Sequence, residues 1–278
     1  MTTTLRPTGP EQFDAEGVRS RCYDICVNSR PVGSLKLSTD PQKGPTTGRV
    51  VRLAVDDAER RRGRGAVAAL SAEEVLRRWG CNRVETSIPA DAHAALGLAG
   101  SLGYQERGRS LLKELGDRPR LPPGSEDRAM TQAEFPAWRE RGQPLQQRLL
   151  AERGVPPHEV VRRAADAFDG LLPQGADTPT AALRVLVHDG EEVGVVWVEL
   201  ERSPRRDAGA YVYEVEVDEA YRGRGHGRSL MLVAEREALD SGAGILGLHV
   251  YAYNTPALNL YSSLGYRPVE LHFFKPLL

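Results

Sequence analysis

Cysteine, long apolar runs and an excess of charge are all scarce in this chain of 278 residues. Its three cysteines are too few and too irregularly spaced for a disulfide framework or a zinc site, so we expect buried thiols and no metal. No apolar run approaches the ~20 residues that a bilayer span needs, and the N-terminus lacks the apolar core of a signal peptide. We therefore expect a cytoplasmic protein without a membrane partner.

The charge balance is equally uninformative about large acidic partners. The net charge is −1 and the isoelectric point lies near 6.6, which gives no overall attraction to nucleic acid, so no nucleic-acid partner is expected. Hydrophobic residues make up 40% and charged residues 27% of the chain, as in ordinary globular proteins. The length is sufficient for two domains of ordinary size.

What the chain does contain is a glycine-rich hexapeptide that occurs twice. RRRGRG at 60–65 and RGRGHG at 222–227 each follow a strand-like apolar run, and each opens a helix-like segment. A shift of 162 positions superposes them, and the same shift without a gap places the tripeptide LGY at 102–104 on LGY at 264–266. We infer that one domain has been duplicated.

The repeat sets the expected domain boundaries. The first domain is predicted at 1–115, a linker rich in proline, glycine and charge at 116–127, and the second domain at 128–278. Each copy is expected to run strand, glycine loop, helix, strand, helix, strand. Two further helices, at 131–153 and 157–168, have no obvious counterpart in the first half. The helix before the final strand is expected to be capped by Thr255, with Pro256 at its first position.

A glycine-rich turn that enters a helix is suited to holding phosphate. The backbone N–H groups of the first helical turn lack partners and point at the ligand, and the positive end of the helix dipole favours negative charge. Glycine lets the backbone approach closely or take positive φ, and arginine can add bidentate contacts to phosphate oxygens. The hexapeptide alone would be weak evidence, because arginine and glycine recur by chance in such a composition.

Together with its surroundings, the second hexapeptide resembles the GNAT acyltransferase superfamily. The loop fits the pattern R/QxxGxG/A, and the segment LHVYAYNTPALNLYSSLGY at 248–266 follows with the expected order and spacing. The resemblance covers nearly the whole chain. It implies an α/β (α+β) protein with two tandem GNAT folds, each a mixed, mostly antiparallel twisted sheet flanked by helices. The architecture is similar to that of mycothiol synthase, which also pairs an inert-looking and an active domain.

The resemblance further implies an acyl-coenzyme A site in the second domain, with acetyl-coenzyme A as the acyl donor. The strand before the loop would part from its neighbour, and the pantetheine arm would pair with its exposed backbone. Asn254 would position the pantetheine arm or the following helix. The residues expected to bind the coenzyme are Val215, Val217, Arg222, Gly223, Arg224, Gly225, His226, Gly227, Arg228 and Asn254.

Four side chains are candidates for the chemistry. Tyr261 matches the family's usual general acid, which protonates the departing thiolate, and a phenol can do so without a large pKa shift. An amine must be neutral to attack a thioester, so a base is also needed. Glu214 and Glu216 share a strand face, and His249 lies where ribosomal-protein N-terminal acetyltransferases carry a glutamate base; we favour Glu216 slightly.

Each candidate also has a purely structural interpretation. Tyr261 could be a core tyrosine, the glutamates a solvated or ion-paired strand face, and His249 a hydrogen-bonded strand residue. The first domain keeps its glycine loop but carries Ala99, Ala92, Ala54 and Ser87 where the second has Tyr261, Asn254, Glu216 and His249. We therefore expect a degenerate first copy that supports the fold, with residual coenzyme binding left open.

The leading hypothesis is an N-acetyltransferase that moves an acetyl or other short acyl group from acyl-coenzyme A to a primary amine of a small molecule by direct attack. One alternative is transfer to a protein or peptide N-terminus. Another is a non-enzymatic protein that binds or senses coenzyme A, although a pure binder has no need of Tyr261. Aminoacyl transfer from charged RNA would want a basic surface, which the net charge does not provide. The sequence is compatible with a monomer or a homodimer.

Overall fold

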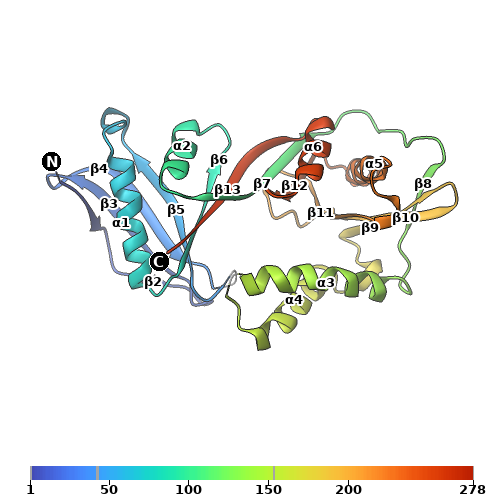
Figure 1. Ribbon diagram of the computed structural model, residues 1–278, viewed down its shortest axis with the longest axis horizontal. Coiled ribbons are helices and arrows are strands. Elements are labelled where there is room, and N and C mark those ends of the chain that lie inside the picture. Colours follow the sequence, from blue (N-terminus) through green and yellow to red (C-terminus); the bar gives the residue numbers. More distant parts are fainter. Residues whose placement is uncertain (1, 42–43, 153, 278) are drawn as a thin grey trace. The chain divides into compact units, whose positions relative to one another are not determined.

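The computed structural model describes residues 2–41, 44–152 and 154–277, apart from the side chain of residue 145 (Figure 1). The chain forms two compact units. Unit 1 comprises Met1–Arg107, Gln147–Val161 and Glu270–Leu278, and unit 2 comprises Gly108–Gln146 and Arg162–Val269. Each unit contains one copy of the repeated glycine loop.

Unit 1 is built on a mixed sheet in the order β1-β3-β4-β5-β6-β13, with the short strand β2 paired to β3. Strands β5 and β6 run parallel, and the other pairs are antiparallel. Its strands are β1 (Thr3–Pro7), β2 (Gln12–Phe13), β3 (Arg19–Val27), β4 (Arg30–Thr39), β5 (Thr47–Val55), β6 (Arg83–Pro89) and the end of β13 (Arg267–Pro276). Its helices are the 3₁₀ turn η1 (Asp57–Glu59), α1 (Arg64–Arg78) and α2 (His93–Ser101).

Unit 2 repeats this order as β7-β12-β11-β10-β9-β8, again with a single parallel pair, β11 with β12. Its strands are β7 (Gln105–Glu114), β8 (Ser125–Ala129), β9 (Ala181–His188), β10 (Glu191–Glu199), β11 (Ala210–Val217) and β12 (Ile245–Tyr251). Its turns and helices are η2 (Gly175–Asp177), η3 (Glu219–Tyr221), α5 (His226–Asp240) and α6 (Thr255–Ser263), with parts of α3 (Phe135–Glu152) and α4 (Pro157–Leu171). The predicted fold class is confirmed.

The duplication is visible in the element bounds themselves. Helix α1 and helix α5, like α2 and α6, and β6 and β12, begin and end at positions related by the shift found in the sequence. The two copies differ between their first two long strands. The segment between β8 and β9 holds α3 and α4, whereas residues 8–18, between β1 and β3, contain only the two-residue strand β2 and no helix.

The last strand of each repeat belongs to the other unit. Strand β7, which ends the first repeat, pairs with β12 from Gly108 to Glu114, and β13, which ends the chain, pairs with β6 from Glu270 to Pro276 (Figure 1, where β13 is red). The compact units therefore do not coincide with the sequence blocks 1–115 and 128–278, which remain our prediction for the duplicated segments.

Each exchanged strand brings a lysine to a buried glutamate. In unit 2, Lys113 Nζ lies 2.5 Å from the carboxylate of Glu235 on α5, and the hydroxyl of Tyr266 donates to the same carboxylate at 3.2 Å. In unit 1, Lys275 Nζ lies 2.8 Å from Glu73 on α1. We call these the two Glu–Lys latches. Because a buried carboxylate without a partner is strongly destabilising, each latch helps to fix the exchanged strand in place.

Two apolar layers cover the sheet of unit 2. One face packs against α5 and α6 through a core that includes Leu230, Leu246 and Tyr261. The opposite face carries an aromatic cluster in which Trp138 of α3 and Trp197 of β10 meet edge to face. In unit 1 the main core lies between the sheet and helices α1 and α2. Among the residues that the structure describes, no helix is both long and apolar enough to cross a membrane.

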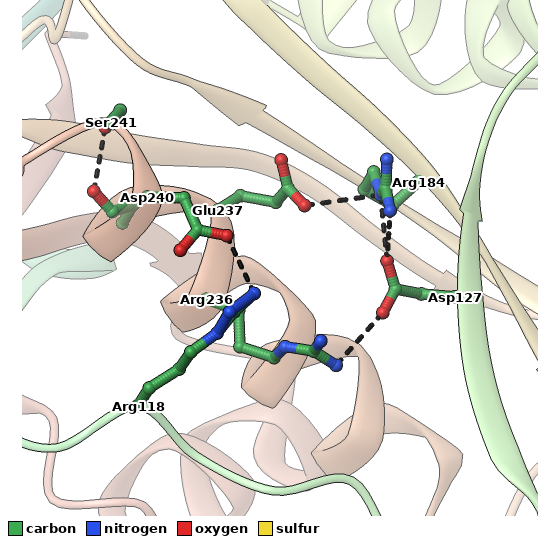
Figure 2. A network of polar contacts seen from close by, with 8 residues as sticks. Arg118, Asp127, Arg184, Arg236, Glu237, Asp240 and Ser241 are labelled. Atoms are coloured by element: carbon green, nitrogen blue, oxygen red, sulfur yellow. Dashed lines mark hydrogen bonds and ion pairs between the residues drawn. The ribbon is translucent and has the colours of Figure 1, made fainter.

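The predicted linker is partly structured. Its last residues enter β8, which pairs with β9, and the β8 residue Asp127 accepts from Arg184 at 2.9 Å and Arg236 at 3.2 Å. Figure 2 shows this network, in which Arg118 also donates to Asp240 of α5 at 2.7 Å. The segment expected as a free linker is therefore anchored along α5, because its charged side chains find partners there.

Two local expectations for the helices need correction. The helix expected from residue 131 begins at Phe135 and continues through Pro144, and its expected last residue, 153, lies outside the described residues. We expected Thr255 to cap the helix before the final strand, but the cap is Asn254, whose side-chain oxygen accepts from the N–H of Ala257 at 3.2 Å. The helix starts one residue earlier than a Pro256 first position requires.

Candidate active site

Strands β11 and β12 separate halfway along their length. Their parallel pairing runs only from Ala210 opposite Leu246 to Val212 opposite Leu248. The rest of β11 still pairs with β10 on its other side, up to Val217 opposite Gly194. The edge of β11 that carries Val215 and Val217 is thus left without a neighbouring strand within the described residues. An extended ligand arm can hydrogen-bond to such an edge as an added strand would.

The glycine loop follows directly on this free edge. Gly223 has a φ of 78° and Gly225 a φ of 90°, and Gly225 is the N-cap of α5, where no side chain caps the helix. A side chain at either position would be strained. A Cβ at Gly227 would lie 3.3 Å from Leu260 of α6, so this position needs a small residue for close helix packing. The loop therefore offers uncapped N–H groups at a helix N-terminus, the arrangement that suits a pyrophosphate.

The arginines of the loop have different local roles. Arg222 folds back and donates from Nε to the carbonyl of Val217 at 3.1 Å, which closes the loop onto the end of β11. Arg228 donates to the hydroxyl of Ser263 at 2.6 Å. The guanidinium of Arg224 lies over the ring of Tyr221, 5.6 Å from its centroid. Within the described residues, none of these three arginines forms an ion pair with a carboxylate, so their positive charges remain at the helix N-terminus.

The side chain of His226 turns away from solvent. It is buried, and its ring lies 4.8 Å from that of His188 at the end of β9. Burial, together with His188 and Arg224, lowers the pKa of His226 below its ordinary value. The imidazole is thus kept neutral, and His226 can serve the expected phosphate site through its backbone N–H.

A β-bulge brings Glu214 and Glu216 to one face of the sheet. The register of β10 with β11 shifts between Trp197 and Val198, so that Tyr213 is left out of the pairing and Glu214 lies opposite Trp197. Glu216 lies opposite Val195, and both partners belong to the aromatic cluster of unit 2. Both carboxylates therefore project on the face that α3 and α4 cover, as the sequence predicted.

The pKa of Glu214 is raised. Burial and, to a smaller extent, the charge of Glu216 raise this pKa to about 7, while Arg141 of α3 opposes the shift. The half-buried carboxylate lies beneath α3 at Gly142, where a Cβ would come within 3.9 Å of both carboxylate oxygens. A carboxylate with a pKa near neutrality can accept a proton from an amine at working pH. The sequence named Glu214 as a candidate but gave no signal for its burial, which depends on α3.

A small cavity lies next to Val195, the residue that pairs with Glu216 in the sheet, although neither Glu214 nor Glu216 lines it. Its volume is about 160 Å³. Val195 and Gly194 of β10 form one wall, opposite Glu216 and Val217, and Trp138 and Arg141 of α3 another. Three carboxylates complete the lining, from Glu134, Glu192 and Asp218. Sequence reasoning missed this cavity, because α3, β10 and the end of β11 are distant in the chain.

Tyr261 lies on the other face of the sheet. It belongs to the core between the sheet and α5, and its ring lies 5.9 Å from that of Tyr266. Burial raises its pKa to about 12. The phenol is therefore protonated throughout the working pH range, but it is a weaker proton donor than the sequence argument assumed, since that argument took a phenol near its ordinary pKa.

His249 lies on β12, and Asn254 follows at the start of α6, close to the point where β11 and β12 separate. The neighbours of His249 on the strand, Leu248 and Val250, point into the core, so His249 projects on the face of the glutamates. Its ring packs edge to face on Tyr251 at 5.2 Å and lies across Gly108 of β7. Asn254 caps α6, the helix that carries Tyr261. The expected residues are thus grouped around the point where β11 and β12 part, with His249 and the glutamates on one face and Tyr261 on the other.

Metal ligands are not grouped in the same way. Within the described part of the chain, no three or more His, Cys, Asp or Glu side chains are arranged to hold a metal ion.

Comparisons with known protein families agree with this geometry. A family model described as the acetyltransferase (GNAT) family matches residues 3–104 and 146–266, one region for each glycine loop. A mycothiol acetyltransferase of Saccharomonospora viridis is 30% identical over 293 residues, covering 96% of this chain and 86% of that protein. The uncharacterized N-acetyltransferase YdgE of Bacillus subtilis is 27% identical over 151 residues, covering 53% of this chain and 95% of that protein.

Two solved structures share the fold across both units. A GCN5-related N-acetyltransferase from Sphaerobacter thermophilus has a TM-score of 0.59 at 17% identity and covers 92% of this chain and 80% of its own. A tandem GNAT protein from the clavulanic acid biosynthesis pathway has a TM-score of 0.52 at 20% identity and covers 96% of this chain and 85% of its own. At these identities the likeness extends to the fold alone.

Proposed function

This chain belongs to the GNAT acetyltransferase family and is an acyl-CoA-dependent acetyltransferase, and we propose that its second unit acetylates a primary amine of a small molecule. The observation that carries the proposal is the raised pKa of Glu214, about 7, on the face where β11 and β12 separate. A base of this strength is what an amine acceptor requires, since the amine must lose a proton before or during attack.

The donor site is assigned to the free edge of β11 and the loop that follows. The pyrophosphate of acetyl-coenzyme A would lie on the N–H groups of 222–228, and the pantetheine arm would pair with the backbone of Val215 and Val217. Gly223 and Gly225 provide the positive φ values of the loop, and the uncapped start of α5 provides its electrostatics. Acetyl-coenzyme A contributes the activated thioester; binding and proton transfer belong to the chain.

The reaction is a direct displacement. The amine nitrogen attacks the thioester carbonyl, a C–N bond forms, and the C–S bond breaks to release the coenzyme as a thiolate. Glu214 takes the proton that the amine loses, and Glu216 keeps the pKa of Glu214 high enough for this. Tyr261, on the opposite face, stays protonated and donates a hydrogen bond to the departing sulfur. His249 is a further proton acceptor on the face of the glutamates.

The acceptor is assigned to the cavity next to Val195. Its carboxylate at Asp218 favours a cationic amine, and Trp138 offers an apolar wall. The carboxylate of Glu192 is already paired with Arg128. The pKa of Glu134 is about 2, because Arg128 and Thr131 bind its carboxylate, so this group stays charged but is already paired. At about 160 Å³ the cavity accepts only the amine-bearing end of an acceptor. The relatives named mycothiol acetyltransferases make amine precursors of small thiols one class to test.

The test is a turnover assay in which released coenzyme A is measured with a thiol-reactive dye. Small primary amines and peptides with free N-termini are compared as acceptors, and products are identified by mass spectrometry. Replacing Tyr261 by Phe is expected to lower kcat by about tenfold or more with little change in coenzyme affinity, since only the departing thiolate loses its donor. Tyr253→Phe, at an exposed tyrosine, is the matched control. Turnover with peptides alone, or equal kcat in Tyr261→Phe, would contradict the assignment.

A further inference from the structure

Unit 1 contains a largely apolar cavity, partly open to solvent, that the proposed reaction does not use. Its volume is about 280 Å³, and it lies between β5 and β6 where these strands separate. Their parallel pairing ends at Val50 opposite Thr86, and the cavity continues past this point along both strands. The remaining walls come mainly from α2, with Leu98, Ala99 and Leu102.

The cavity exists because one ring is missing. Ala99 occupies the position that corresponds to Tyr261, and it is buried at the cavity wall. In unit 2 the phenol ring of Tyr261 fills the equivalent place in the core. The polar atoms of the cavity are largely satisfied, since the hydroxyl of Thr86 donates to the carbonyl of Val50 at 3.1 Å and that of Ser87 is bonded to His272. The space therefore suits an apolar group.

A second cavity lies next to the first, at the intact glycine loop of unit 1. It measures about 750 Å³ and shares Leu53, Ala95 and Leu98 with the apolar cavity. Gly63, with a φ of 73°, caps α1 without a side-chain hydrogen bond, as Gly225 does for α5. The shared wall residues place the two cavities next to each other, one at the glycine loop and the other at the apolar space beside Ala99.

The charges at the loop end favour an anion. Arg60 lines this end, donates to the carbonyl of Val55 at 2.9 Å and forms an exposed ion pair with Asp57 at 2.7 Å. The buried carboxylate of Glu59 is neutralised by Arg64, Arg62 and Arg30. The surplus of arginine at this end matches a pyrophosphate, and the combined length of the adjacent cavities matches an extended thioester.

The groups that would cleave a thioester are absent from unit 1. Arg52 and Ala54 stand at the positions of Glu214 and Glu216, and Ala99 at that of the acid. The segment 8–18, equivalent to the one that carries α3 and α4 in unit 2, contains no helix. Only the last residues of α3 and the first residues of α4 belong to unit 1. A bound thioester would therefore be held without the base and the acid assigned to unit 2.

We propose that unit 1 is a binding site for coenzyme A thioesters whose acyl chain is longer than acetyl, and that it holds them without transfer. The glycine loop of unit 1 takes the pyrophosphate, and the cavity beside Ala99 takes the chain. This goes beyond the acetyl transfer assigned to unit 2, and it makes the duplicated domain a sensor of longer acyl-coenzyme A. Each buried methylene is expected to tighten binding by roughly fourfold.

The test is a calorimetric titration of the full chain with acetyl-coenzyme A and with hexanoyl-coenzyme A. Hexanoyl-coenzyme A is expected to show a site at least about tenfold tighter than acetyl-coenzyme A shows at the same loop. Ala99→Tyr, which restores the ring of unit 2, should remove the preference for hexanoyl-coenzyme A. If the tyrosine disturbs folding, the smaller change Ala99→Leu replaces it and should reduce that preference. Ser101→Tyr adds the same ring at an exposed position of α2 and should keep the preference.

Equal affinity of the wild-type chain for the two thioesters would overturn the proposal, and so would a preference that survives in Ala99→Tyr. Because the readout is binding, it is independent of turnover at unit 2. If no amine is acetylated while the preference for hexanoyl-coenzyme A is found, the proposed function fails and the site in unit 1 stands. If amines are acetylated and the preference is absent, the reverse holds.

Discussion

The two units have the same scaffold and different interiors. Both place a glycine loop after a strand that separates from its parallel neighbour, and both carry a Glu–Lys latch. Unit 2 fills the space beyond the separation with Tyr261 and covers the sheet with α3 and α4. Unit 1 leaves a cavity beside Ala99. The features that we propose to bind a coenzyme are thus common to both copies, and those that we propose to react belong to one.

This difference shows how a duplicated domain can lose chemistry without losing its fold. The latch and the loop are held by backbone geometry and buried charge, which unit 1 retains. The catalytic groups are single side chains on the same backbone, and exchanging a tyrosine for an alanine leaves a cavity that the surrounding elements tolerate. The largest differences between the units should therefore appear in turnover, and the smallest in stability.

Removing the base should have the largest effect. Glu214→Gln keeps the size of the side chain but cannot take a proton, so kcat should fall by about 10²-fold or more. Arg52→Gln, at the equivalent position of unit 1, is the matched control and should change kcat by less than about threefold. Both are measured by release of coenzyme A under saturating substrates. A larger loss of kcat in Arg52→Gln than in Glu214→Gln would indicate that the reaction takes place in unit 1, and would contradict the assignment to unit 2.

Breaking a latch should destabilise both units alike. Lys113→Met and Lys275→Met each leave a buried glutamate without its cation, and each should lower the free energy of unfolding by about 2–3 kcal/mol, discounted for the partial exposure of the lysines. Thermal melts measure the loss, and hydrogen exchange locates it, in β12 for Lys113→Met and in β6 for Lys275→Met. If one variant melts at the same temperature as the wild-type chain, its latch does not stabilise its unit, and the two units differ in this respect.

The pH dependence should reveal the coupling of the two glutamates. Because the pKa of Glu214 is raised to about 7, kcat/KM should increase as pH rises through that value and the carboxyl loses its proton. Glu216→Gln removes a nearby negative charge, so the inflection should move to lower pH. Comparing the two profiles cancels the titration of the amine itself. An unchanged inflection in Glu216→Gln would mean that another group controls the rate.

The same shift has a consequence for stability. A carboxyl whose pKa is raised on folding contributes most below its ordinary value of 4.5, and that contribution is lost as pH rises through about 7. Chemical denaturation at pH 5 and pH 8 should therefore show a smaller difference for Glu214→Gln than for the wild-type chain. A larger difference in stability between pH 5 and pH 8 in Glu214→Gln than in the wild-type chain would contradict a raised pKa of Glu214.

Much of the fold follows from the sequence because it rests on local signals. The glycine loop, the apolar runs before and after it and the fixed shift between copies predicted the order of strand, helix and strand, which α1 with β6 and α5 with β12 show in the structure. The exchange of β7 and β13 could not be predicted in this way. Both strands follow the same LGY tripeptide and carry a lysine at the same repeat position, so each fits either sheet equally well.

The site was only partly predictable for a similar reason. The spacing of Glu214 and Glu216 gave their shared face, but the raised pKa of Glu214 depends on its burial beneath Gly142 of α3. The substitution of Ala99 for a tyrosine was visible in the sequence as a loss. That this loss leaves a cavity next to the one at the glycine loop depends on how β5 and β6 separate, which no local pattern encodes.

The central claim, that acetyl transfer belongs to unit 2, is tested most directly by the pair Gly225→Asp and Gly63→Asp. Aspartate tolerates positive φ better than most residues, and its charge lies where the pyrophosphate must bind. We predict that kcat/KM for acetyl-coenzyme A falls about a hundredfold further in Gly225→Asp than in Gly63→Asp, with similar melting temperatures. A larger loss in Gly63→Asp, or an equal loss in both, would contradict the account.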